Sequence, residues 1–308
     1  MRVAHISDLH LLDLEGAVPL RLFNKRLTGF ANLKLRRVHK HKPEPVKLAA
    51  NHLREMKVDH VVITGDLTNL ALEREFERVR HVLEHELGLD PEHVSVVPGN
   101  HDAYTRGAHR TNRFGQYFDA YTTTDLPEIA PQGMFPFVRL RGHLAIIGVS
   151  TAVPHLPFVA AGRVGKDQLA RLSAALQHPE VKSRHVLLLQ HHPLDNPASR
   201  LKTKLEGLAD AEMEHAVIDG DLNVLLLHGH WHRRSHRRVA HPRPTTRAHF
   251  DVIGATSASL LDPDPDRMAG FNLYELANDG SLEAVSCGRF DPASRTFEHA
   301  QVPLVARH

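Results

Sequence analysis

Short, continuous apolar runs are the most regular feature of the chain, and each run stops at a cluster of polar residues. Val, Leu and Ile dominate these runs, and Gly or Pro follows closely, which is typical of strands that are buried on both faces. We predict five such strands, which end at about residues 6, 63, 97, 189 and 227. Helical spacing of apolar residues predicts helices at about 46–56, 72–87, 165–176 and 211–218. Strands that alternate with helices in this way are typical of an α/β fold.

The remaining segments have weaker patterns. Residues 137–140 and 144–149 resemble a hairpin, and from about residue 233 onward the chain is mostly β, with strands near 250–253, 271–276 and 282–287. Asn278-Asp279-Gly280 supplies a hairpin turn between the last two strands. Residues 103–136 contain only a short helical pattern, at 113–121. A long irregular stretch inside a compact domain is usually a functional lid or a disordered loop, and we predict a lid.

Residues 20–42 form a basic segment without any acidic residue, and Pro43 and Pro45 close it. If this segment is helical, its Leu, Phe and Val residues fall on one stripe and its Lys and Arg residues oppose them. Two interpretations stay open. The segment is either an ordinary helix that packs its stripe on the core, or an amphipathic helix that lies in a membrane interface and is drawn to anionic lipid. Gly29 and Asn32 would also allow two short helices.

Composition narrows the classes of function. The 308 residues, 42% of them hydrophobic, can bury a large core. We predict one domain over 1–308, which contains a basic insertion at 20–42 and a β-rich C-terminal part at about 233–308. A net charge of +2, from 38 basic and 36 acidic residues, excludes a polycation built to coat nucleic acid, and no specific nucleic acid is indicated as a partner. The oligomeric state cannot be inferred from these features.

Cysteine content and the lengths of the apolar runs bear on location. Cys287 is the only cysteine, which excludes an internal disulfide framework and a zinc–thiolate cluster. No charged and apolar leader precedes the first strand, and no apolar stretch approaches the roughly 20 residues that span a bilayer. We therefore expect a cytoplasmic protein, with peripheral contact at the inner face of a membrane as the alternative if residues 20–42 bind lipid.

The polar residues at the strand ends are of the kinds that bind metal ions. The carboxyl ends of neighbouring strands converge on one crevice in open α/β sheets. In extended backbone, the spacing of Asp8 and His10 also points both side chains to the same side. The candidate donors are two carboxylates, one amide and four imidazoles: Asp8, His10, Asp66, Asn100, His191, His230 and His232.

This donor set selects among metals and among chemistries. Carboxylate, amide and imidazole without sulfur suit Mn, Fe, Zn or Co better than Ca, Mg or copper. Seven donors are too many for one tetrahedral ion and fit two ions that share a carboxylate. Two such ions can hold a bridging hydroxide and stabilise both the attacking and the leaving oxygen in a displacement at phosphorus.

A single histidine is weak evidence for a metal ligand, because the chain contains 26 histidines. His5, His60, His143 and His185 are interpreted as core or surface residues. The combination is more specific, because the five motifs occur in a fixed order and each follows a predicted strand. They are Asp8-Leu9-His10, Gly65-Asp66, Gly99-Asn100-His101-Asp102, His191-His192-Pro193 and Gly229-His230-Trp231-His232.

These five motifs resemble those of the calcineurin-like metallophosphoesterases, over about three-quarters of the chain. The resemblance implies a four-layer α/β/β/α sandwich with a dinuclear site at the loop ends of its two sheets. One ion would be held by Asp8, His10, Asp66 and His232, and the other by Asp66, Asn100, His191 and His230, so that Asp66 bridges them. His101 would contact the phosphate and protonate or stabilise the leaving oxygen, Asp102 would orient His101, and His192 is either part of the site or a packing neighbour.

The expected function is hydrolysis of a phosphodiester or phosphomonoester by a metal-bridging hydroxide, with two divalent or trivalent ions of Mn, Fe or Zn as cofactors. One alternative is a membrane-associated pyrophosphohydrolase of a lipid-linked nucleotide such as UDP-diacylglucosamine, which would use residues 20–42. A second alternative is a cyclic-nucleotide phosphodiesterase. Enzymes of that kind often carry Arg two residues after the G-N-H-D run, whereas Ala103-Tyr104 follow it here.

Two further interpretations concern binding. A non-catalytic scaffold is the competing class of function, but a scaffold has no physical need for seven converging polar groups, whose desolvation is costly without metal. Arg233 and Arg234, with Arg237 and Arg238, follow directly after His232. Because guanidinium groups suit phosphate, we assign Arg233 and Arg234 to the substrate entrance, with a solvated strand as the alternative.

Overall fold

The computed structural model describes residues 1–14, 40–103, 106–130, 134–155, 158–196, 199–218 and 220–305. The basic segment at 20–42 falls outside these residues except for its last three positions. Its predicted helix and both interpretations of that helix therefore stay predictions.

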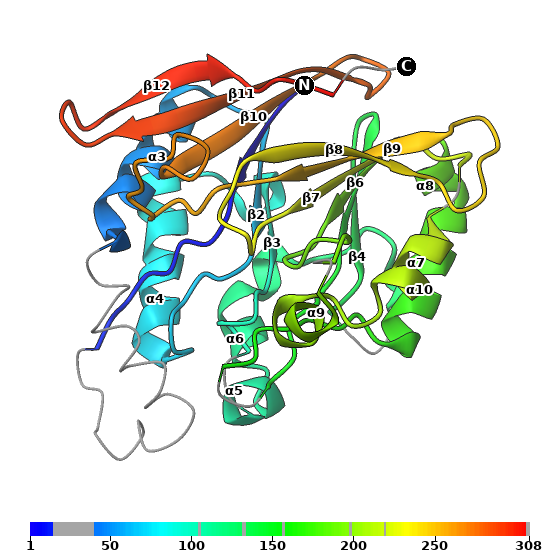
Figure 1. The fold of residues 1–308 in the computed structure, drawn as a ribbon, viewed down its shortest axis with the longest axis horizontal. Coiled ribbons are helices and arrows are strands. Elements are labelled where there is room, and N and C mark those ends of the chain that lie inside the picture. The colour runs from blue at the N-terminus through cyan, green and yellow to red at the C-terminus, as the bar shows by residue number, and fades with distance from the viewer. Residues whose placement is uncertain are drawn as a thin grey trace.

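Two six-stranded sheets form the centre of the protein (Figure 1). The first sheet contains, in order across it, β12 (Thr296–Gln301), β11 (Leu282–Asp291), β10 (Gly270–Leu276), β1 (Arg2–Ile6), β2 (His60–Thr64) and β3 (Val94–Val97). The second contains β4 (Phe137–Arg141), β5 (Leu144–Gly148), β6 (His185–Leu189), β7 (Val224–His228), β9 (His249–Gly254) and β8 (Ser235–Ala240). The five predicted apolar strands are β1, β2, β3, β6 and β7. They pair in parallel within each sheet, so their carboxyl ends meet at one edge.

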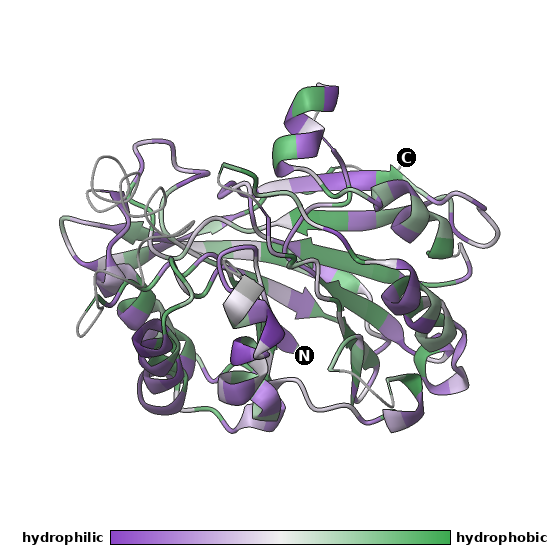
Figure 2. Cartoon of the chain, turned by 90° about the horizontal axis from the view of Figure 1, so that it is seen from below, coloured by the Kyte–Doolittle hydropathy of each residue, from purple (hydrophilic) through white to green (hydrophobic). Residues whose placement is uncertain are grey.

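Helices cover the outer face of each sheet, which gives four layers (Figures 1 and 2). The first sheet is covered by α3 (Pro43–Glu55), α4 (Glu73–His81), α5 (Arg106–Arg110) and α6 (Arg113–Phe118). The second is covered by α7 (Lys166–Gln177), α8 (Pro179–Lys182) and α10 (Ala211–Val217). Shorter helical turns span Val82–Leu87, Pro91–His93, Asp119–Tyr121 and Pro127–Ile129, and α9 (Arg200–Glu206) stands near the strand ends. The expected four-layer α/β/β/α sandwich is confirmed.

The central strands contribute to two cores at once. In β2, Val61 and Ile63 pack against the helices of the first sheet, and Val62 between them packs in the layer that separates the two sheets. Leu187 of β6 lies in the same central layer, opposite to Leu188, which packs against the helices of the second sheet. Burial on both faces explains why these strands read as unbroken apolar runs.

The helix bounds differ from the prediction in two places. Pro43 and Pro45 lie in the first turn of α3 rather than closing the preceding segment, because proline lacks only an N–H that the first helical turn leaves unpaired. The predicted helix at 72–87 is regular only to His81 and continues as a π-helical turn to Leu87. Gly88, with φ of 62°, ends it.

Part of the segment for which a lid is predicted packs in the core, and a lid formed by its other residues stays a prediction. Residues 113–118 form α6, as the helical pattern indicated, and Phe114 and Phe118 are buried against the first sheet's helical layer. Tyr121 joins the same core. Residues 113–121 of this segment therefore form part of the hydrophobic core.

A buried arginine fastens the same segment. The side chain of Arg139 in β4 is fully buried and donates hydrogen bonds to the carbonyl oxygens of Ala120 (2.9 Å) and Thr123 (3.1 Å). It also donates to the carbonyl of Val94 in β3, at 2.6 Å. One guanidinium thus joins the segment to both sheets.

Of the described strands and α-helices, five are absent from the sequence-based prediction: β8, β12, α5, α8 and α9. The residues of β8 and β12 are mainly polar and partly exposed, so neither strand produces an apolar run. Among the described residues, no helix combines the length and the apolar character needed to span a membrane.

Candidate metal centre

The candidate donors come from the ends of both sheets and meet between them. Asp8 and His10 follow β1, Asp66 follows β2 and Asn100 follows β3. The three remaining donors, His191, His230 and His232, follow β6 and β7 of the other sheet. Contacts between side chains of the two sheets bring the donors together, as convergence of the strand ends predicts.

The first group of donors surrounds one oxygen of Asp8. The Nε2 atom of His232 lies 2.9 Å from Asp8 Oδ1, and the Nε2 atom of His10 lies 3.9 Å from it. The two Nε2 atoms are 3.2 Å apart. One donor atom from each of Asp8, His10, Asp66 and His232 falls within 4.8 Å of all the others.

Asp66 faces both groups of donors. Its Oδ2 atom lies 3.8 Å from His10 Nε2 in the first group and 3.4 Å from His191 Nε2 in the second. Asn100 Oδ1 is 3.2 Å from the same nitrogen of His191. The ring of His230 lies 5.2 Å from that of His191, and because its Nε2 meets the carbonyl of Glu206 in α9 at 2.7 Å, its Nδ1 is the nitrogen left for a metal.

The protonation states of the site suit cations. Burial opposes ionisation of Asp66, but His191, His101 and His10 hold its pKa well below the ordinary value. Burial and the nearby His41 keep the pKa of His10 well below its ordinary value, so that its ring is neutral. Ionised carboxylates beside neutral imidazoles are the forms that bind metal ions.

His191 is held in the orientation of a metal ligand. Its Nδ1 donates a hydrogen bond to the carbonyl of Thr64 at 2.7 Å, which leaves Nε2 directed at Asp66. Burial disfavours protonation of His191, but the carboxylates of Asp66 and Asp8 raise its pKa to about 9. A metal ion would take the place of this proton, since metal binding to histidine releases protons.

Backbone strain is concentrated at these residues. Five of the seven donors have left-handed backbone: Asp8 (φ 52°), His10 (φ 46°), Asp66 (φ 50°), His230 (φ 68°) and His232 (φ 48°). The expectation that extended backbone aligns Asp8 with His10 is therefore wrong. Residues other than glycine adopt this conformation at a cost of about 1–3 kcal/mol each, and such residues cluster at functional sites.

Two motif glycines are explained by close approach. A Cβ atom on Gly99 would collide with the backbone nitrogen and the carboxylate of Asp66, and one on Gly229 would collide with the side chains of Ser7 and Asp8. Glycine at position 99 lets the loop after β3 approach Asp66 after the neighbouring strand β2, and glycine at position 229 lets the loop after β7 press against Asp8 of the other sheet.

The donor set fits a pair of metal ions. Oδ1 of Asp8 is buried and faces Nε2 of His232 at 2.9 Å and Nε2 of His10 at 3.9 Å. A buried carboxylate gathered with two imidazoles is a donor set that suits a transition-metal ion. The arrangement of Asp66 between the two groups fits a carboxylate shared by two ions.

His101 lies beside the first group, but Asp102 does not orient it. The Nδ1 atom of His101 meets the carbonyl of Asn69 at 2.7 Å, and its ring stands edge-on to that of His10 at 5.1 Å. The carboxylate of Asp102 instead accepts hydrogen bonds from the backbone N–H groups of Gly99 (2.9 Å) and Thr68 (3.0 Å). Its role is to brace the loops after β2 and β3.

The alternatives for His192 are decided by its two ring nitrogens. Nδ1 pairs with the hydroxyl of Thr151 at 2.7 Å, and Nε2 pairs with the carbonyl of Ala160 at 2.8 Å. Burial lowers the pKa of His192 to about 3. With both nitrogens engaged by the protein, His192 is a packing neighbour of the site.

Sequence reasoning missed His41, which contacts two donors. Its ring lies 4.8 Å from that of His10 and 5.5 Å from that of His232, both in edge-on geometry. The Nδ1 atom of His41 pairs with the hydroxyl of Ser259 at 2.8 Å. The backbone on either side of His41 is bonded to residues 259 and 261, so the ring is fixed in place. No repeat or motif marks this histidine, which is the second-last residue of the basic segment.

Residues 1–234 match the sequence profile of a family described as calcineurin-like phosphoesterase. This chain belongs to that family. It is therefore a metallophosphoesterase, a hydrolase of phosphoric esters, and its donors occupy the positions that the motif resemblance assigns to metal ligands. A search of curated proteins finds no significant match to the sequence.

Two solved structures show the same fold as this phosphoesterase. A dimetal phosphatase from Danio rerio is 17% identical, with a TM-score of 0.55 over 93% of this chain and 95% of that one. Purple acid phosphatase PPD1 from yellow lupin (Lupinus luteus) seeds is 12% identical, with a TM-score of 0.56 over 97% of this chain and 52% of that one. At these identities the likeness concerns the fold alone.

The assignment of Arg234 to the substrate entrance of the phosphoesterase is wrong. Arg234 is only 5% exposed, and its guanidinium donates to the carbonyl oxygens of Pro265 (2.8 Å) and Gly288 (3.2 Å). It holds the loop before β10 against β11. Arg233 is more exposed and forms an ion pair with Asp264, so its part in substrate binding stays a prediction.

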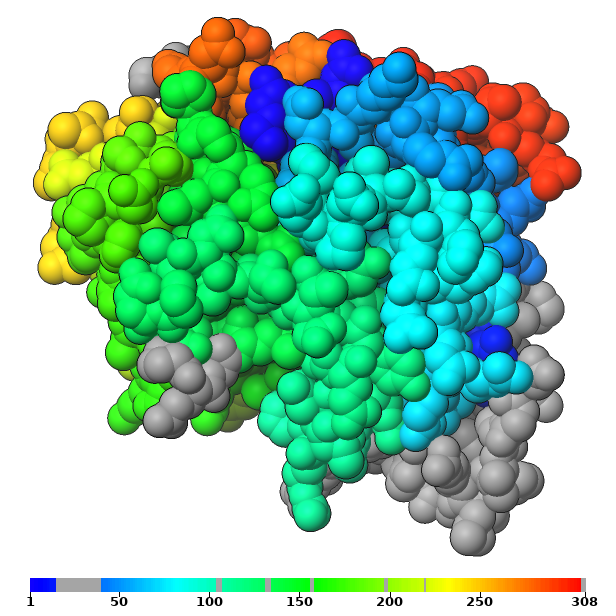
Figure 3. All heavy atoms as spheres, turned by 180° about the vertical axis from the view of Figure 1, so that it is seen from behind, coloured from blue at the N-terminus to red at the C-terminus, as the bar shows by residue number. Residues whose placement is uncertain are grey.

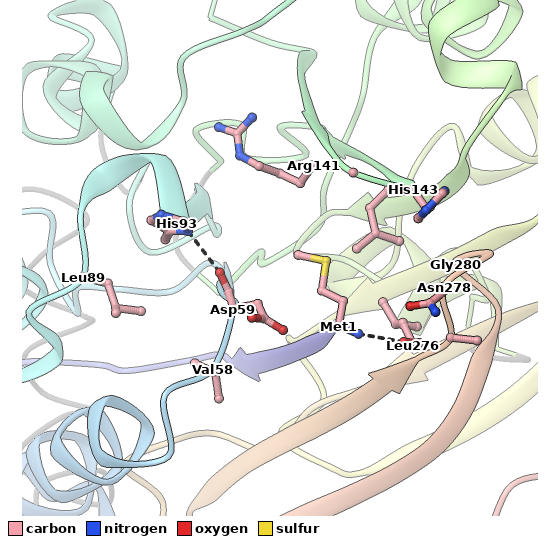
Figure 4. A pocket seen from close by; sticks show the side chains of 13 residues that line it. Met1, Val58, Asp59, Leu89, His93, Arg141, His143, Leu276, Asn278 and Gly280 are labelled. Carbon is pink, nitrogen blue, oxygen red and sulfur yellow. Dashed lines mark hydrogen bonds between the residues drawn. The ribbon is translucent and has the colours of Figure 1, made fainter.

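A separate cavity of about 620 Å³ lies at the other end of the phosphoesterase, where the central strands begin. Figure 3 shows this region from behind, near the top, where blue, cyan, green and orange segments meet. Met1, Leu276 and His143 are among the residues that line it, and the N–H₃ group of Met1 donates to the Leu276 carbonyl at 2.8 Å (Figure 4). Because β1 and β3 begin here and end at the donors, the cavity is remote from the metal centre.

Proposed function

We propose that this phosphoesterase hydrolyses a small phosphate ester at a dinuclear centre of Mn, Fe or Zn ions. Asp8, His10, Asp66 and His232 would hold one ion, and Asp66, Asn100, His191 and His230 the other. The observation that supports this most directly is the position of Asp66 Oδ2 between His10 Nε2, at 3.8 Å, and His191 Nε2, at 3.4 Å. A carboxylate oxygen in that position could bind the metal ion of each donor group.

Metal ions at such a centre act as Lewis acids, which lower the pKa of water and neutralise charge on a phosphoryl group. The protein's own residues position the substrate and move its protons. His101, fixed through Nδ1 by the Asn69 carbonyl, presents the rest of its ring toward the centre beside His10. We assign His101 the task of protonating or stabilising the leaving oxygen.

The dependence on metal can be tested with the purified protein. After removal of metal by a chelator, we expect no hydrolysis of bis-p-nitrophenyl phosphate, and added Mn²⁺ should restore it. Isothermal titration with Mn²⁺ should show two ions per chain. Parallel assays with p-nitrophenyl phosphate would separate diesterase from monoesterase activity. Full activity in excess chelator would disprove the proposal, and so would a chain that binds no metal.

His41 is proposed to contact the phosphoryl group. Asp8 and Asp66 are buried, whereas His41 and His232 are partly exposed, so His41 lies on the solvent side of the first group of donors. Its ring nitrogen falls within 4.8 Å of those of His10 and His232, but His41 is not part of the set that includes Asp8 and Asp66. This position suits a hydrogen bond to a substrate oxygen better than a place in the metal's own shell.

His41→Gln should therefore weaken substrate binding and spare the metal. A hydrogen bond to a charged group contributes about 1.5–3 kcal/mol, so kcat/KM for bis-p-nitrophenyl phosphate should fall by about 10–100-fold, mainly through KM. Mn²⁺ titration should still show two ions. His143→Gln, at the far end of the molecule, serves as the control and should leave kcat/KM unchanged. A lost or weakened Mn²⁺ site in His41→Gln would instead identify His41 as a ligand.

A further inference from the structure

A row of buried side chains connects the layer between the sheets to Asp8. The hydroxyl of Tyr274 in β10 lies 2.9 Å from Nδ1 of His5 in β1, and Nε2 of His5 lies 2.8 Å from Oγ1 of Thr64 in β2. Thr64 Oγ1 donates to Ser7 Oγ at 2.8 Å, and Ser7 Oγ donates to Asp8 Oδ2 at 2.7 Å. All five side chains are buried.

The chemistry of the groups fixes the direction of every hydrogen bond in this row. The ionised carboxylate of Asp8 can only accept, so Ser7 donates to it and must accept from Thr64. Thr64, having donated its one proton, accepts from Nε2–H of His5. His5 is neutral, since burial and then the nearby His228 lower its pKa to about 3, and its Nδ1 accepts from the hydroxyl of Tyr274. The Tyr274 oxygen in turn accepts from the Asn272 amide, at 3.3 Å.

The row ends on the oxygen of Asp8 that faces away from the imidazoles. Oδ2 accepts from Ser7 Oγ and also from the backbone N–H of His230 at 3.1 Å. Oδ1, by contrast, faces the metal centre, where His232 Nε2 lies 2.9 Å from it. Two donors on Oδ2 therefore prevent the carboxylate from rotating and keep Oδ1 for a cation.

We propose that His5, Thr64 and Tyr274 are positioning residues for the metal ligand Asp8, acting through Ser7. Donors that all point the same way polarise one another, which strengthens the last hydrogen bond to the carboxylate. Partners of a metal ligand that lie outside the metal's own shell commonly change metal affinity by about 10–100-fold. This inference rests on the proposed function, because it requires Asp8 to hold an ion.

The chain offers a matched control. His60 in β2 is also fully buried, and its Nε2 pairs with the hydroxyl of Ser95 in β3 at 2.9 Å. Burial likewise lowers the pKa of His60 to about 3. This pair has the same chemistry as the pair of His5 and Thr64 but has no hydrogen bond to a metal ligand. Removing the hydroxyl of Ser95 reproduces the loss of a buried hydrogen bond without touching Asp8.

The test compares Thr64→Val with Ser95→Ala in metal titrations of the full chain. Thr64→Val keeps the shape of the side chain but removes the only hydroxyl that joins His5 to Ser7. We expect one of the two Mn²⁺ ions to bind about 10–100-fold more weakly, while the other binds as before. Thr64→Ser, which retains the hydroxyl, should restore the affinity. Tyr274→Phe should show a smaller loss for the same ion, because it removes a donor that is two hydrogen bonds further from Asp8 than Thr64 is.

The outcomes separate this inference from the proposed function. If the unaltered chain binds no Mn²⁺, the proposed function fails first. If it binds two ions and Thr64→Val binds both with unchanged affinity, the positioning role is wrong while the metal centre stands. Equal weakening in Thr64→Val and Ser95→Ala would also overturn the inference, because it would trace the effect to general loss of stability. Thermal unfolding of both variants without metal shows whether their stabilities are comparable.

Discussion

Asp66→Asn is expected to abolish turnover and to remove at least one metal ion. The substitution keeps the size of the side chain but removes the charge of the one carboxylate that faces both donor groups, at 3.8 Å from His10 and 3.4 Å from His191. Stabilisation by metal ions contributes several kcal/mol to the transition state, and roughly 1.4 kcal/mol is a factor of ten, so kcat should fall by about 10³-fold or more. Hydrolysis of bis-p-nitrophenyl phosphate at saturating Mn²⁺ measures the first effect, and elemental analysis measures the second.

Asp125→Asn provides the control for this substitution. Asp125 pairs with Arg141 at 2.8 Å, at the opposite end of the sandwich from the donors. Its loss should leave both kcat and the metal content unchanged. Retention of two ions and of more than about a tenth of kcat in Asp66→Asn would show that Asp66 does not bridge the centre, since each factor of ten represents only about 1.4 kcal/mol.

The convergence of the donors could be predicted from the sequence because it depends on a general property of sheets. Parallel strands place their carboxyl ends at one edge, so Asp8 after β1 and Asp66 after β2 had to be neighbours. The two sheets face each other across a layer of Val, Leu and Ile, which brings His191 of the second sheet to the same place. Most of the fold and the donor set could therefore be predicted from the apolar pattern and from the order of the motifs.

The backbone geometry of the donors could not be predicted in the same way. Asp8 and His10 are left-handed at φ of 52° and 46°, a conformation that sequence propensity disfavours. It persists because the surrounding contacts impose it: the backbone N–H groups of these two residues donate to the carbonyl oxygens of Gly65 (2.9 Å) and Asp66 (3.0 Å). Backbone strain that is imposed by residues distant in the sequence produces no periodic pattern from which it could be predicted.

Charged residues misled the sequence analysis wherever burial decides their role. The sequence pattern assigns Arg234 to the substrate entrance and gives Arg139 no role, yet both donate from their guanidinium groups to backbone carbonyl oxygens inside the protein. Asp102 follows His101 directly, but its carboxylate turns to backbone N–H groups. Apart from Gly99, each of these partners is a backbone atom distant in the sequence, which no motif records.

The second large effect is expected at His101, to which the proposed function assigns transfer of a proton to the leaving oxygen. The carbonyl of Asn69 accepts from Nδ1–H at 2.7 Å and so fixes the ring, while the backbone N–H of His101 donates to Asp66 Oδ1 at 2.8 Å. His101→Ala should lower kcat by about 10²–10⁴-fold for esters whose leaving group has a high pKa. The loss should be smaller for p-nitrophenyl esters, because p-nitrophenol needs little protonation. Mn²⁺ titration should still show two ions.

Asp102→Asn separates this role from a merely structural one. Asp102 accepts hydrogen bonds from the backbone N–H groups of Gly99 and Thr68, and burial and the nearby Asp66 raise its pKa to about 7. An amide there keeps one acceptor oxygen and loses the other, so we expect a lower unfolding temperature and a loss of kcat that is the same for both kinds of leaving group. If His101→Ala also showed equal losses for p-nitrophenyl and alkyl esters, His101 would stabilise the site without donating the proton, and another group would have to supply it.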